Sequence, residues 1–161
     1  MEKWDLVDAN GCSLGILWER SRHKEIPQGI YHPCVEVWVK VCDKLLITRR
    51  HPDKSEPLKF DLPGGAVLSG ESVMQGAIRE LYEEVGISTS SDSLIKLGEM
   101  TNGNVFATSY LLCLDELPEL VLQATEVVGY KLVSKEEFES MTDDITRGTL
   151  RRYPLYKDQL F

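Results

Sequence analysis

The stretch that decides the fold is residues 62–87, which read LPGGAVLSGESVMQGAIRELYEEVGI. Apolar residues recur in its second half at every fourth position, which is the spacing of one buried helix face. Ser72 and Gln75 fit a capping box at the start of that helix, and Gly86 stands where a helix stops. The stretch therefore predicts a glycine-rich turn followed by a helix from Ser72 to Val85.

Three glutamates of this helix, Glu80, Glu83 and Glu84, are three and four residues apart and share one face. Like charges at this spacing repel one another. Converging carboxylate oxygens are ligands that Mg²⁺ or Mn²⁺ prefers, whereas a solvated acidic face explains most glutamate-rich helices. The sequence around the glutamates is needed to distinguish a metal site from a solvated acidic face.

The surrounding residues follow the spacing G-x5-E-x7-R-E-U-x-E-E-x-G-U, where U is aliphatic. Every defined position is filled, by Gly65, Glu71, Arg79, Glu80, Leu81, Glu83, Glu84, Gly86 and Ile87. Chance assembly of this pattern is on the order of 10⁻⁷ per chain. The chain thus resembles the Nudix hydrolase family, whose fold is an α/β/α sandwich with a mixed β-sheet. The resemblance implies hydrolysis of a diphosphate bond in a nucleoside diphosphate linked to another moiety, or in a related diphosphate.

The resemblance also implies a metal site. Glu80, Glu83 and Glu84 are expected to bind Mg²⁺, with Mn²⁺ as an alternative. A backbone carbonyl at Gly64 or Gly65 is expected to lie close enough to add a ligand.

Two more residues of the motif are expected to support the glutamates. Arg79 is predicted to orient them through charge-assisted bonds, and Glu71 to act as a hydrogen-bonding partner behind them. The carboxylate that accepts a proton from the attacking water is left open among Glu83, Glu84 and Glu126.

Substrate contacts are predicted less sharply, because specificity depends on loops outside the motif. Arg49 and Arg50 are candidates to meet phosphate, together with the backbone of Gly64 and Gly65. Residues 147–152 contain a second basic cluster, for which solvated charge is the simpler interpretation.

Three other functions fit the sequence less well. Residues 65–72 have the spacing of a P-loop, but Glu71 replaces its lysine and would repel phosphate. The N-terminal residues, with His32 before a valine strand, resemble the isopentenyl-diphosphate-isomerase branch, yet residues 62–65 lack the cysteine and the histidine of the isomerases. A non-catalytic ligand-sensing domain commonly has a degraded motif, and this motif is intact. Hydrolysis is therefore favoured.

Composition limits the partners. A net charge of −8 and four cysteines without zinc-like spacing argue against a nucleic-acid binder and a zinc site. Three of the cysteines stand in apolar or strand-like contexts and are expected to be buried reduced thiols. No leader and no apolar run of membrane-spanning length is seen, so a cytoplasmic protein without a membrane partner is expected.

The remaining elements are expected to complete one α/β (α+β) domain over residues 1–161, with residues 1–30 as a hairpin extension. Strands are predicted at 35–41, 45–48, 94–100, 105–114 and 127–133, and a capping box at Ser134–Glu137 predicts a further helix. A last helix from Thr146 to Arg152 is expected to end before Pro154. Whether the chain forms a homodimer is left open.

Overall fold

The computed structural model describes residues 1–161 as nine strands and six helical segments. The strands are β1 (Lys3–Val7), β2 (Ser13–Glu19), β3 (His32–Val41), β4 (Lys44–Arg50), β5 (Phe60–Asp61), β6 (Gly64–Ala66), β7 (Leu94–Asn102), β8 (Val105–Leu114) and β9 (Val127–Val133). The α-helices are α1 (Val73–Val85), α2 (Lys135–Ser140) and α3 (Arg147–Leu160), and short 3₁₀ helices are η1 (Arg20–Glu25), η2 (Ser91–Ser93) and η3 (Thr142–Asp144). None of these helices has the length and apolar character needed to cross a membrane.

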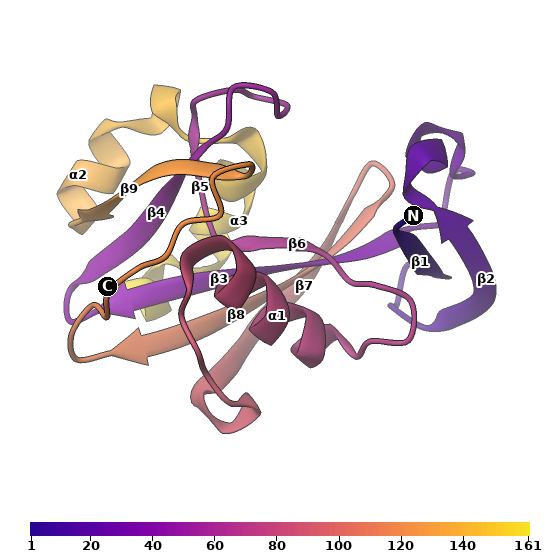
Figure 1. Cartoon of the computed structure of the whole chain (residues 1–161), viewed down its shortest axis with the longest axis horizontal. Helices are drawn as coiled ribbons and strands as arrows, with labels where there is room; N and C mark the ends of the chain where they lie inside the picture. Colours follow the sequence, from indigo (N-terminus) through magenta and orange to yellow (C-terminus); the bar gives the residue numbers. More distant parts are fainter.

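A mixed seven-stranded sheet forms the centre of the molecule (Figure 1). Its main order is β5-β4-β3-β8-β7, with β6 paired to β3 and β9 paired to β4. β3 and β8 run parallel from the pair His32–Val105 to the pair Val41–Leu114, and the other pairs are antiparallel. The long parallel pairing makes β3 the strand around which the site is built.

Two apolar layers cover the two faces of this sheet, because neighbouring residues of a strand point to opposite sides. Val37 and Val39 of β3 lie in one cluster with Leu81 of α1. Trp38 lies in the other cluster, with Phe138 of α2 and Tyr153 of α3. The predicted α/β/α sandwich with a mixed sheet is therefore confirmed.

The predicted N-terminal hairpin is also present, at one end of the molecule (Figure 1). β1 and β2 form their own two-stranded sheet, and Trp4, Leu6 and Ile26 make a small core against Ala66 of β6. The Asp5 carboxylate accepts hydrogen bonds from Ser69 Oγ and Gly70 N, both at 2.9 Å. These contacts fix the hairpin to the loop that leads into α1.

The prediction that the last helix ends before Pro154 is wrong. α3 continues through Pro154 to Leu160. Pro154 removes one backbone hydrogen bond and costs about 3 kcal/mol. Tyr153, Tyr156 and Leu160 are buried in the second apolar cluster, and burial stabilises such side chains by about 1.5–3 kcal/mol each. Packing on both sides of the proline therefore outweighs the lost bond.

The expected burial of three cysteines is also wrong. Cys12, Cys42 and Cys113 are exposed, Cys34 is half-buried, and all four are free thiols. Cys42 is exposed because it lies in the turn between β3 and β4, where φ is +55°.

Candidate active site

The carboxylate helix α1 has the limits that its sequence predicts. Ser72 Oγ accepts from Gln75 N, the Gln75 side chain accepts from Ser72 N, and Gly86 ends the helix with φ of +76°. Glu84 is buried and Glu80 is half-buried against the Gly64–Ala66 strand, whereas the side chain of Glu83 is 45% exposed. The helix therefore holds two of its glutamates inward and one at the rim.

Arg79 binds several oxygen groups around the site at once. Its Nε donates to Glu71 Oε1 at 2.6 Å, and its Nη1 donates to Glu80 Oε1 at 2.8 Å. Nη1 also donates to Glu83 Oε2 at 3.1 Å, and Nη2 donates to the Ala66 carbonyl at 2.9 Å. Arg79 thus joins the start of α1, its glutamate face and strand β6.

These contacts change how the groups titrate. Hydrogen bonding to Glu71 raises the pKa of Arg79 further above its usual range. Burial alone would raise the pKa of Glu71, but the hydrogen bonds from Arg79 and from Leu68 N, together with the charge of Arg79, outweigh burial and lower the pKa. Both groups therefore remain charged over the whole physiological range.

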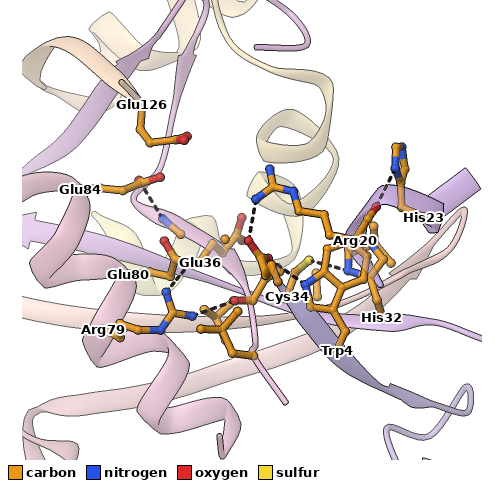
Figure 2. Close-up of a pocket in the computed structure, with 18 of the residues that line it drawn as sticks. Trp4, Arg20, His23, His32, Cys34, Glu36, Arg79, Glu80, Glu84 and Glu126 are labelled. Carbon is orange, nitrogen blue, oxygen red and sulfur yellow. Dashed lines mark hydrogen bonds and ion pairs between the residues drawn. The ribbon is translucent and has the colours of Figure 1, made fainter. Parts of the chain in front are cut away.

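Glu84 is the most deeply placed carboxylate of the helix. Its side chain is 6% exposed, and burial raises its pKa to about 8. Gly64 N donates to Glu84 Oε2 at 3.2 Å, and Lys54 Nζ lies 3.9 Å from Glu84 Oε1. Lys54 also forms an ion pair with Glu126 (Figure 2 shows Glu126 beside Glu84). Burial thus favours the neutral form of Glu84, and a bound cation would stabilise its ionised form.

The donor set fits a hard divalent cation, although the side chains do not enclose one as they stand. No group of three or more His, Cys, Asp or Glu side chains converges as a metal site. The Arg79 guanidinium bridges Glu80 and Glu83, and the Lys54 ammonium lies beside Glu84. A Cβ at Gly65 would lie 2.5 Å from Glu80 Oε1. Any residue other than glycine would therefore displace the Glu80 carboxylate. Metal-binding roles for Glu80, Glu83 and Glu84 stay a prediction.

A cavity of about 960 Å³ opens in front of these carboxylates. Most of the predicted site residues line it, namely Glu80, Glu83, Glu84, Glu126, Arg79, Arg50, Gly64 and Gly65. Arg49 and Glu71 do not line it. Arg49 follows the alternation of strand β4 and points away from the face of Arg50, where its Nε donates to the Leu58 carbonyl. Glu71 lies behind Arg79, as expected of a supporting group.

Several charged residues of the cavity were not predicted from the sequence, among them three basic residues from different parts of the chain. Lys54 lies in a polar loop that looks solvated in the sequence. Arg152 belongs to the basic cluster interpreted as solvated, but its Nη2 meets the buried Glu36 Oε2 at 2.5 Å. Arg20 comes from the N-terminal segment. For Arg152 the sequence does hold a signal, because Glu36 interrupts the valine strand β3 on the face of Trp38 and a carboxylate there needs a buried cation.

The glycine turn and the α1 carboxylates thus line one polar cavity. The chain belongs to the Nudix family, because the family model described as NUDIX domain matches residues 30–158. It is a Nudix hydrolase, an enzyme of the pyrophosphohydrolase type. Members of this family generally use divalent metal ions and act on small nucleotide-diphosphate substrates.

Similar proteins agree in family and fold. An uncharacterised Nudix hydrolase of Listeria monocytogenes, lmo0368, is 31% identical over 145 residues, covering 88% of this chain and 85% of the relative. The crystal structure of DR0079 from Deinococcus radiodurans superposes with a TM-score of 0.75 at 23% identity, covering 97% of this chain and 98% of that one. A bifunctional NMN adenylyltransferase/ADP ribose pyrophosphatase of Francisella tularensis, complexed with AMP and a manganese ion, has a TM-score of 0.69 at 21% identity. That match covers 81% of this chain and 42% of the other.

Proposed function

We propose that the protein hydrolyses the diphosphate bond of a nucleoside diphosphate linked to another moiety, or of a related diphosphate, with Mg²⁺ as its metal and Mn²⁺ as an alternative. The observation that carries the proposal is the complete Nudix motif folded into α1, with Glu80 and Glu84 turned into the cavity. We also propose that residues 1–161 work as one domain to which the N-terminal hairpin contributes.

Glu80, Glu83 and Glu84 would hold the metal ion, and the backbone at Gly64 or Gly65 would add a carbonyl. A bound divalent ion neutralises charge on the diphosphate and lowers the pKa of a water molecule. The side chains of the protein would hold these ligands in position. Arg79 keeps Glu80 and Glu83 in place, with Glu71 behind it.

Proton transfer needs a carboxylate near the attacking water. Glu83, Glu84 and Glu126 are the candidates, and all three line the cavity. Glu126 is already charge-paired with Lys54, whereas Glu84 has only a distant cation and one backbone donor. This difference favours Glu84 over Glu126 as the proton acceptor.

Arg50 is the substrate-facing residue of the pair proposed from the sequence. Its Nη1 donates to Asp61 Oδ2 at 2.7 Å, which holds the guanidinium at the cavity wall. Arg50 and the Gly64–Gly65 backbone would then meet phosphate oxygens.

A second candidate function is isomerisation of isopentenyl diphosphate, because Cys34 and His32 line the same cavity with Sγ and Nδ1 3.4 Å apart. Burial raises the pKa of the Cys34 thiol to about 12 and lowers the pKa of His32 to about 4, so both are neutral. Only 8 of the 29 lining residues are hydrophobic, which suits a polar substrate better than an isoprenoid chain. Hydrolysis is therefore the better supported function.

A diphosphate panel tests the proposal. Nucleotide sugars, dinucleotides, (d)NTPs, ADP-ribose and isopentenyl diphosphate are incubated with Mg²⁺, and kcat/KM is scored from released phosphate or mononucleotide. Hydrolysis of at least one nucleotide-containing diphosphate is expected. Conversion of isopentenyl diphosphate to its isomer would support the isomerase function in place of hydrolysis. Absence of product from every compound would favour a ligand-sensing domain.

A further inference from the structure

The N-terminal segment builds part of the cavity although it lies outside the matched domain. The NUDIX match begins at residue 30. Six cavity-lining residues precede it, namely Met1, Glu2, Lys3, Trp4, Arg20 and His23. Figure 2 shows Trp4, Arg20 and His23 across the cavity from Glu80, Glu84 and Glu126. The cavity thus has a second wall that the Nudix motif does not supply.

Arg20 is the cation of this wall that is fixed most firmly. Because β1 pairs with β2 through Lys3 and Glu19, Glu2 lies opposite Arg20, and Arg20 N donates to the Glu2 carbonyl at 3.1 Å. The side chains meet as well, since Arg20 Nη1 donates to Glu2 Oε2 at 2.7 Å. Glu2 Oε1 accepts from Trp4 Nε1 at 2.8 Å, and this bond holds the carboxylate from the other side.

The Arg20 guanidinium retains free donors that face the carboxylates. Its side chain is 61% exposed and makes one hydrogen bond, so most of its N–H groups are unused. The bond to Glu2 raises the pKa of Arg20, and the charges of Glu126 and Glu80 raise it further, so these groups are near enough to interact. Figure 2 shows the guanidinium directed into the cavity toward them.

We propose that Arg20 is a substrate-positioning residue, which binds a phosphate oxygen of the diphosphate from the wall opposite the Nudix helix. This inference rests on the proposed function, because it places the diphosphate between α1 and the hairpin. The planar guanidinium suits a phosphate oxyanion, and its positive charge would offset the repulsion between the anionic diphosphate and the glutamates. Arg79 is less suited to this task because its donors are already taken by Glu71, Glu80, Glu83 and Ala66.

The test measures binding of methylenediphosphonate, a diphosphate analogue that cannot be hydrolysed, by calorimetry in the presence of Mg²⁺. Arg20→Met should weaken this binding roughly 10- to 100-fold, as expected for the loss of a charge-assisted contact. Arg20→Lys should recover part of it. Arg22→Met is the matched control, because Arg22 lies on the same 3₁₀ helix, pairs with Glu25 and covers Trp18 outside the cavity. It should bind within about twofold of wild type.

Two further measurements separate positioning from structure. Mn²⁺ affinity of the variants, measured without the analogue, should stay within about twofold of wild type. The double variant Glu2→Gln/Arg20→Met should remain as weak as Arg20→Met. Recovery of wild-type binding in the double variant would mean that an uncovered Glu2 repels the anion, and this would overturn the proposal.

The proposal would also be overturned if Arg20→Met bound the analogue as wild type does, or if wild type did not bind it at millimolar concentration. A parallel loss of Mn²⁺ affinity in Arg20→Met would point to a structural role and count against it equally. Failure of the diphosphate panel is a separate result, because analogue binding requires no turnover.

Discussion

At the scale of single residues, Arg79 connects more of the site than any other side chain. Its contacts to Glu71, Glu80 and Glu83 need a planar fork with several donors, which an ammonium group cannot supply. Arg79→Lys should therefore lower kcat/KM or metal affinity roughly 10- to 100-fold, as for other residues that orient metal ligands. The control is Arg151→Lys at an exposed position of α3, and equal activity of the two variants would remove the orienting role.

Substitution of Glu84 tests the catalytic role of the α1 carboxylates. Glu84→Gln keeps the shape of the side chain and its bond from Gly64, so the variant should remain folded. It should lose most activity because a neutral amide neither neutralises a metal ion nor accepts a proton. Initial rates at saturating Mg²⁺ are compared with those of the exposed control Glu116→Gln. Wild-type turnover by Glu84→Gln would refute the assignment.

His32 should make stability depend on pH. It is buried and stacked on Trp4 at a ring distance of 4.1 Å, and burial lowers its pKa from 6.5 to about 4. The unfolded chain therefore takes up a proton below pH 6.5 that the folded chain refuses. The stabilisation is present above pH 6.5 and is lost as pH falls toward 4, by about 3 kcal/mol in total. The raised pKa of Glu84 acts in the opposite direction in both proteins, so the test compares wild type with His32→Gln. The difference between their free energies of unfolding, measured with urea, should change by this amount as pH falls, and a difference that does not depend on pH would contradict it.

The residue scale also shows what the sequence could and could not predict. That the motif glutamates and Arg79 lie together at one cavity could be predicted, because their spacing is local and specific. Arg49 and Arg50 could not be separated, since neighbouring strand residues exchange faces with a register shift of one position. The pairing of β4 with β5 and β9 fixes that register, and it is made by residues distant in the sequence.

At the scale of elements, helix α1 depends on its capping box. Ser72→Ala removes the acceptor for Gln75 N and should lower the free energy of unfolding by about 1 kcal/mol. Ser90→Ala is the control, because Ser90 occupies the cap position of η2 without a side-chain hydrogen bond. The free energies of unfolding of both variants are measured by chemical denaturation and compared with that of wild type. An equal, small effect would mean that packing alone positions α1.

The limits of α1 were predictable and those of α3 were not. Ser72, Gln75 and Gly86 satisfy the ends of α1 through local contacts, which a sequence states directly. α3 continues through Pro154 because Tyr153 and Tyr156 pack into a core formed by strands distant in the sequence. Local sequence patterns thus predict the ends of a capped helix, whereas tertiary packing determines where an uncapped helix ends.

At the scale of the whole molecule, the cavity collects charges from every part of the chain. Arg20 comes from the hairpin, Lys54 from the loop before β5, and Arg152 from α3. The sequence alone does not distinguish these residues from solvated charges, because only the folded chain places a carboxylate opposite each of them. The pairs Glu2–Arg20, Glu126–Lys54 and Glu36–Arg152 are the result.

The central claim, hydrolysis that depends on a metal ion held by the α1 carboxylates, is tested most directly by removing and restoring the metal. Protein stripped with EDTA and dialysed is assayed on the best diphosphate of the panel while Mg²⁺ is titrated back. We expect no hydrolysis by the stripped protein and recovery of full activity with Mg²⁺, or with Mn²⁺. Undiminished hydrolysis by the stripped protein would contradict the account.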